Sequence, residues 1–263
     1  CGTTNIPAVD DSRTLTAWIN ADELSGDQGI IFTGTWGDND MFTMGLLAAN
    51  PTKISVWGYN HDVTGSTVLS TGIWYHIAIT YNALDGELKS YINGALDINT
   101  PTTDYTTSLG TVEIGRASTD EFNGTIDEVT IWNRALTQEE IQALLDQYFE
   151  WMWEIAKWWL IRMTRNELNV HEMMTLFWHN YFATAQSKVF YPQAMYQQNA
   201  VFREYGLGNF KELLRRVTFA PAMMIWLDIH RSKKHAPNEN FARELLELFT
   251  MGVDNYTQDD ILE

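Results

Sequence analysis

The periodicity of apolar residues changes once along the chain, and this change constrains the fold more than any other feature. Over residues 14 to 132, apolar and polar residues alternate with a period of two in short runs such as LTAWIN, WYHIAITYN and TIDEVTIWN. These runs are rich in β-branched and aromatic residues and are separated by Gly, Asn and Asp, which is typical of strands. The pattern predicts an antiparallel β-sandwich, with hairpins at Asp85-Gly86 and Asn93-Gly94.

From Thr137 onward the pattern becomes helical. Thr137 and Glu140 form a capping box, in which each side chain satisfies a backbone N–H of the other residue at a helix start. Further helix boundaries are indicated by the caps and stops Asn169, Gly206, Asn209, Asn238 and Gly252. The sequence therefore predicts two domains, a β-sandwich over 1–145 and an all-α domain over 146–263. Because no flexible linker separates them, we expect one long helix to join them.

Charge and composition exclude several classes of protein. The 263 residues are 45% hydrophobic, enough for a packed core, and the net charge is −17. The acids are concentrated in residues 1–145, which hold 19 acids and 5 bases, and no basic stripe offsets them. This field disfavours nucleic acid as a partner. No apolar run approaches the ~18 residues of a membrane span, and the single cysteine excludes an intramolecular disulfide.

The segments GIWYHIAITYN, LKSYINGAL and FNGTIDEVTIWNRALTQEEIQALL together resemble a laminin-G-like, concanavalin A-like jelly roll of the bacterial type. The resemblance covers about residues 1–145. In that family a CG pair often lies within the first strand, so Cys1-Gly2 implies a chain entered partway through the domain, with the first strand missing. The resemblance implies a module that binds carbohydrate or protein outside the cytoplasm, often beside calcium.

Trp36 and Trp57 are the candidate ligand-binding residues of this module. Each lies beside glycine and loop residues rather than within an apolar run, and aromatic faces can stack on sugar rings. The alternative is that both are core or rim tryptophans of the sandwich.

Asp127 is the candidate calcium ligand. In TIDEVTIWN it has the parity of Val129 and Ile131, so we expect its carboxylate to face the apolar side, where it needs a partner. The resemblance implies a structural calcium completed by backbone carbonyls. Alternatively, the carboxylate accepts backbone N–H groups or pairs with Arg13 or Arg134.

The segments HEMMTLFWHNYFATAQSKV, LGNFKELLRRV, PAMMIWLD and APNENFARELLELFTMGV resemble, in this order, the bacterial family called domain of unknown function 1800. The resemblance covers roughly residues 150–263 and implies an inner portion of a longer domain. The resemblance does not indicate a biochemical activity. The family leads us to expect histidine where this chain has Tyr181.

The helical half offers one set of catalytic candidates, Glu172, His179, Asn240, Arg243, Glu244 and Glu247. The sequence H-E-M-M-T lacks the second histidine of a zinc-binding H-E-x-x-H motif. The last four candidates share one face of an amphipathic helix, where i,i+4 ion pairs are an equally good explanation. A buried acid at position 172 would need a partner.

Three hypotheses follow. The first is a secreted or cell-surface protein whose sandwich binds a polysaccharide or surface glycan, joined to a helical domain of unknown activity. The second is an extracytoplasmic enzyme, such as a metal-assisted hydrolase, with its site in the helical domain. The third is a structural or assembly protein whose helical domain binds a protein partner at the cell surface.

Overall fold

The computed structural model describes residues 6–7, 11–101, 104–165, 169–229, 232 and 238–262. The chain forms two compact units, residues 1–147 and 148–263. The division falls inside helix α1, Gln138–Arg165, so a single helix carries the chain from one unit into the other. Cys1 and Gly2, on which the expectation of a missing first strand rests, lie outside the described residues.

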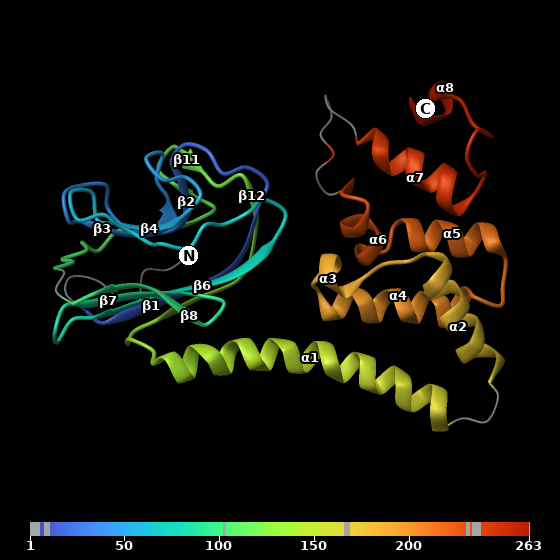
Figure 1. Ribbon diagram of the computed structural model, residues 1–263, viewed down its shortest axis with the longest axis horizontal. Helices are drawn as coiled ribbons and strands as arrows, with labels where there is room; N and C mark the ends of the chain where they lie inside the picture. The colour runs from blue at the N-terminus through green and yellow to red at the C-terminus, as the bar shows by residue number, and fades with distance from the viewer. Residues whose placement is uncertain are drawn as a thin grey trace. The chain divides into compact units, whose positions relative to one another are not determined.

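The first unit is a sandwich of two sheets, seen one above the other in Figure 1. The five-stranded sheet has the order β12-β1-β6-β7-β8, and the seven-stranded sheet has the order β10-β11-β2-β3-β4-β5, with β9 also pairing β2. Its strands are β1 Arg13–Ala21, β2 Gln28–Gly34, β3 Met41–Leu46, β4 Ile54–Trp57, β5 Val63–Thr64, β6 Trp74–Asn82, β7 Glu87–Ile92, β8 Ala95–Thr100, β9 Thr111–Ile114, β10 Arg116–Ala117, β11 Asp120–Glu121 and β12 Gly124–Trp132. The sandwich confirms the sequence prediction, but β11 pairs with β2 in parallel, so the sheet is mixed.

Strand alternation builds the core between the sheets. In β1, Leu15, Ala17 and Ile19 face inward and are fully buried with the inner residues of the opposite sheet. Tight turns connect the strands. Asn93 and Gly94, between β7 and β8, both have positive φ and form the expected two-residue hairpin. At Asp85-Gly86 only the glycine has positive φ, so the β6–β7 connection is a longer turn.

The expected inward direction of Asp127 is wrong, because β12 contains a β-bulge. The register of β1 against β12 shifts between the pairs Thr16–Thr130 and Trp18–Asp127, and Glu128 takes a φ of +49°. The extra residue reverses the alternation, so that Ile126 and Val129 both pack on the core. Asp127 therefore lies on the outer face, opposite Trp18.

The start of α1 covers part of the outer face of the five-stranded sheet. Ile141 and Leu136 are buried against Ala78 and Tyr91 of β6 and β7. The predicted capping box begins this helix: the Thr137 N–H donates to Glu140 Oε2 at 2.9 Å, and the Glu140 N–H donates to Thr137 Oγ1 at 3.3 Å.

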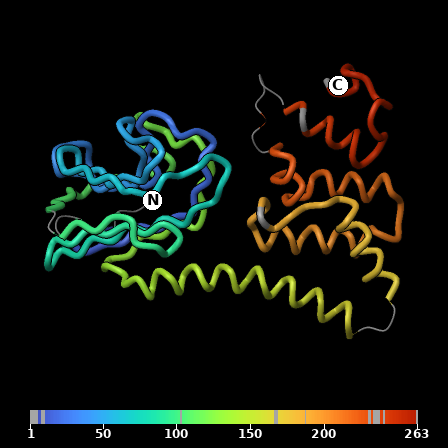
Figure 2. Tube along the Cα trace, in the orientation of Figure 1, coloured from blue at the N-terminus to red at the C-terminus, as the bar shows by residue number. Residues whose placement is uncertain are grey.

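The elements described in residues 148–262 are helices. They follow α1 as α2 Val170–Tyr181, α3 Gln186–Val189, α4 Pro192–Tyr205, α5 Phe210–Thr218, α6 Pro221–Trp226, α7 Glu239–Phe249 and α8 Gln258–Leu262. Helix α4 contacts α2, α5 and α6 and is central to the unit (Figure 2). The side chains of Asn169, Asn209 and Asn238 cap α2, α5 and α7 as the sequence predicts. No helix in the described part of the chain is long and apolar enough to cross a membrane.

Candidate functional site

A pocket of about 370 Å³ opens on the outward face of the seven-stranded sheet. Its walls come from five places in the sequence: the residue before β2, the β2–β3 loop, β3 with the residue after it, the end of β4 with the loop after it, and β11. The lining residues are Asp27, Trp36, Met41, Leu47, Trp57, Tyr59, Asn60, Asp62 and Asp120. Strand pairing of β11 and β3 with β2 brings these separate segments together.

Trp57 forms the floor of the pocket and is only 2% exposed. It clusters with Phe32, Met41 and Ala117 on the face of the sheet opposite the main core. A Cβ at Gly45, on the neighbouring strand, would lie 2.6 Å from Trp57 Cζ2, so only glycine leaves room for the indole. The Trp57 Nε1 is buried without a hydrogen-bond partner among the described residues.

Trp36 and Tyr59 form the aromatic rim. Their side chains are 50% and 47% exposed, and their rings meet edge to face with centroids 6.2 Å apart. Tyr59 has a φ of +63°, a conformation that bulky residues rarely adopt. Such strain persists only where neighbouring contacts hold the backbone in place.

Those contacts brace the loop between β4 and β5. The buried Tyr105 hydroxyl donates to the His61 carbonyl oxygen at 2.8 Å, and the Gly58 N–H donates to Asp62 Oδ1 at 2.9 Å. The Asn39 N–H from the β2–β3 loop donates to the Gly58 carbonyl at 3.1 Å and ties the two aromatic loops together. These hydrogen bonds hold the backbone on both sides of Tyr59.

Three carboxylates and one amide provide the polar lining. Asp27 Oδ1 accepts the Ala48 N–H at 2.6 Å, which orients that side chain. Partial desolvation raises the pKa of Asp62, and the negative charge of Asp27 adds to this rise, while the hydrogen bond from Gly58 opposes it. No Lys or Arg is among the described lining residues. The site therefore offers hydrogen-bond acceptors and repels anions.

Both sequence-predicted tryptophans line this pocket, in different roles: Trp36 is exposed on the rim and Trp57 is the buried floor. Sequence reasoning missed Tyr59, Asn60 and the three aspartates. Tyr59 and Asn60 directly follow Trp57-Gly58, and an aromatic residue beside Asn after a strand was an available signal. Asp27 and Asp120 are 93 positions apart, so the sequence contains no signal that they line the same pocket.

In the helical unit, Glu172 is bound by arginine. Its side chain is buried, and Arg203 donates to both carboxylate oxygens, with Nη2 to Oε2 at 2.7 Å. Arg162 Nε lies 3.5 Å from Oε1, and the Arg203 Nε donates to Asn199 Oδ1 at 2.7 Å. The hydrogen bonds from Arg203 lower the pKa of Glu172. The acid has the partner that its burial requires, so its carboxylate is held in an ion pair.

His179 lines a different cavity of about 350 Å³, bounded by α1, α2, α4 and the segment at the start of α3. Among the described residues, no side chain of α7 lines it. On α7, Arg243 and Glu244 are half-buried, and Glu247 accepts a hydrogen bond from the Tyr256 hydroxyl. The side chain of Asn240 lies outside the described residues. Of the candidates whose side chains the structure describes, His179 alone lines one of the three cavities described here.

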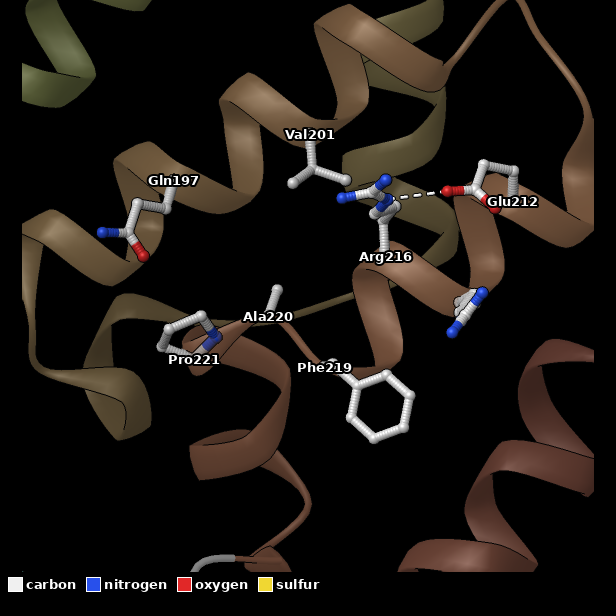
Figure 3. Close-up of a pocket in the computed structure, with 8 residues that line it drawn as sticks. Gln197, Val201, Glu212, Arg216, Phe219, Ala220 and Pro221 are labelled. Carbon is white, nitrogen blue, oxygen red and sulfur yellow. Dashed lines mark hydrogen bonds and ion pairs between the residues drawn. The ribbon is translucent and has the colours of Figure 1, made fainter.

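A third cavity, of about 480 Å³, lies between α4, α5 and the turn that leads into α6 (Figure 3). Arg216 is held there by Glu212, whose Oε1 accepts from the arginine Nε at 2.7 Å. Phe219 is exposed at its edge. Within the described part of the chain, no group of three or more His, Cys, Asp or Glu side chains could hold a metal ion. The Asp127 calcium site stays a prediction, without the inward geometry that motivated it.

The chain forms a β-sandwich with an open pocket on one sheet, followed by a helical unit. The chain belongs to two families: residues 3–142 match the concanavalin A-like lectin/glucanase superfamily, and residues 75–263 match the protein family of unknown function DUF1800. The two matches overlap over 75–142, a range that runs from β6 of the sandwich to the first turns of α1. Both suspected families are thereby confirmed.

The chain is also similar to individual proteins. It is 26% identical to mouse pentraxin-related protein PTX3 over 51% of this chain and spans only 38% of that protein's length. A Bacteroides ovatus protein described as carbohydrate-binding is 24% identical, with a TM-score of 0.46 over 52% of this chain and 42% of its own. Domain 4 of an extracellular arabinanase from Geobacillus stearothermophilus, solved with arabinotriose, is 22% identical, with a TM-score of 0.43 over 53% of this chain and 68% of its own.

Proposed function

We propose that the β-sandwich binds neutral glycans of a polysaccharide or cell surface, outside the cytoplasm, in the pocket between Trp36 and Tyr59. The observation that carries the proposal is the combination of two exposed aromatic rings with acceptor side chains around one opening. The family that residues 3–142 match includes lectins, and this membership supports the same class of ligand.

The chemistry of a sugar fits this combination. A pyranose ring has an apolar C–H face, which packs on an aromatic ring, and hydroxyl groups at its edge, which donate hydrogen bonds. Carboxylate acceptors make these bonds shorter and stronger than neutral acceptors do. Asp27, Asp62 and Asp120 would accept from the hydroxyls, while their charge would reject glycans that carry carboxylate or sulfate groups.

The two alternatives draw less support. A hydrolase that uses Glu172 and His179 would need Glu172 to be free, whereas Arg203 binds both of its oxygens. An assembly role for the helical unit is compatible with its exposed apolar side chains, such as Phe177, and needs a protein partner to be identified.

The test uses the full chain on an array of neutral, sialylated and uronic-acid oligosaccharides, followed by calorimetry with the best neutral binder. Trp36→Ala and Tyr59→Ala should each weaken binding by about 1–2 kcal/mol, which is roughly 5- to 30-fold. Trp153→Ala, an exposed tryptophan of the helical unit, is the matched control and should leave affinity unchanged. Binding only to anionic glycans, or unchanged affinity in both rim variants, would overturn the proposal.

A further inference from the structure

The cavity that holds His179 differs in character from the glycan pocket. Its volume of about 350 Å³ lies within the range of small-molecule sites. Most of its wall is apolar and comes from α1 and α4, including Met152, Ile155, Trp159 and Met195. None of its described lining residues carries a permanent charge. Such a lining favours an uncharged ligand with a substantial apolar body.

One polar group of the cavity lining is a buried hydrogen-bond donor without an acceptor. The Trp159 Nε1 is buried and has no partner among the described residues. Asn199 Oδ1 already accepts from Arg203, so its amide nitrogen is the group left to donate. A buried N–H without an acceptor is destabilising, so a ligand that supplied an acceptor to this group would gain a hydrogen bond.

His179 fits the same environment as a neutral group. Its ring meets Trp159 edge to face, with centroids 5.0 Å apart, and faces Phe202 at 6.4 Å. Burial lowers its pKa, so the imidazole is uncharged at neutral pH and keeps one donor and one acceptor nitrogen. Arg162 of α1 and Arg203 of α4 are both engaged by Glu172.

We infer that this cavity is a binding site for a small uncharged organic molecule with an apolar body and one carbonyl-type oxygen, which accepts a hydrogen bond from Trp159 Nε1. Met152 and Met195 pack against the body, and Met side chains adapt to ligands of different shape. The site is independent of the glycan pocket, because it lies wholly in the helical unit.

The experiment compares acetophenone with isopropenylbenzene, which has nearly the same shape and no acceptor oxygen. Dissociation constants are measured on the full chain by ligand-observed NMR. We expect acetophenone to bind about fivefold more tightly and to shift one indole N–H resonance, which is missing in Trp159→Phe. In that variant the preference should disappear while weak binding of both probes remains.

Two further variants complete the design. Trp153→Phe changes an exposed tryptophan of the same helix and should preserve the preference. Ala156→Phe adds a ring to a residue that lines the cavity and should prevent binding of both probes. Far-ultraviolet circular dichroism establishes that each variant is folded. The inference is overturned if neither probe binds the wild type, if Trp159→Phe keeps the preference, or if a folded Ala156→Phe binds as before.

Discussion

Replacing Arg203 with methionine should destabilise the helical unit strongly. The substitution keeps an apolar stem of similar length and leaves the Glu172 carboxylate buried, 5% exposed, with only the partly exposed Arg162 at 3.5 Å. Removing one partner of a buried ion pair typically costs about 3–5 kcal/mol, because the remaining charge is stranded. With a urea m-value of about 2 kcal/mol/M, the unfolding midpoint should fall by roughly 2 M.

The assay is urea unfolding followed by circular dichroism at 222 nm, which reports mainly on helices and so separates this unit from the sandwich. The matched control is Arg216→Met, which breaks the solvent-exposed ion pair with Glu212 and should lower the unfolding midpoint only slightly, because an exposed pair contributes little to stability. The double variant Glu172→Met/Arg203→Met removes both charges and should recover much of the loss. A loss in Arg203→Met no larger than that of Arg216→Met would refute the reasoning.

The same pair has a definite pH dependence. Arg203 holds the pKa of Glu172 below its ordinary value of 4.5, so the folded state binds this proton less readily than the unfolded chain does. The stabilisation is therefore complete above pH 4.5 and is lost as the pH falls through the lower folded pKa. In Arg203→Met the unpaired carboxyl becomes easier to protonate, so the stability difference from wild type should narrow in acid.

Other predictions concern the sandwich. Gly45→Ala should displace Trp57, costing about 1–3 kcal/mol in urea unfolding and weakening glycan binding; a variant as stable and as tight as wild type would contradict the role of Gly45. Burial lowers the pKa of His76 to about 4. Because the unfolded chain takes up this proton below pH 6.5, about 3 kcal/mol of stability should be lost between pH 6.5 and 4, and His76→Phe should abolish that dependence in pH-resolved thermal melts. Calcium calorimetry should give heat that is lost in Asp127→Ala if the predicted site exists; equal heats would exclude it.

Local sequence signals predicted helix starts well, because a cap involves residues only two or three positions apart. Thr137 and Glu140 form the expected reciprocal bonds, and Asn169 and Asn209 accept from the first turns of their helices. The direction of Asp127 failed for the opposite reason. It depends on a bulge at Glu128, which β12 forms against β1 more than 100 residues earlier, and nothing in the local pattern reveals the extra residue.

In the candidate sites, too, single residues could be recognised from their sequence neighbours, but their partners from distant segments could not. Trp36 was recognisable from its loop setting, and Glu172 from the cost of an acid on an apolar helix. The partner of Glu172 lies 31 positions away on another helix, and Asp120 reaches the pocket of Trp36 and Tyr59 only because β11 pairs with β2. Packing between distant segments selects these neighbours, and a single sequence does not record it.

The nearly buried Trp57 anchors the pocket of the seven-stranded sheet, while Trp36 and Tyr59 lie on the two loops at its rim. The floor residue Trp57 is packed by Gly45 and Phe32, whereas the rim residues are not part of the main core. The sequence of the rim can therefore change in evolution faster than the sequence of the floor. Insertions in residues 35–40 or 58–62 would reshape the opening without disturbing the strands beneath. This arrangement makes the sandwich a scaffold on which new ligand specificities can be selected by loop exchange.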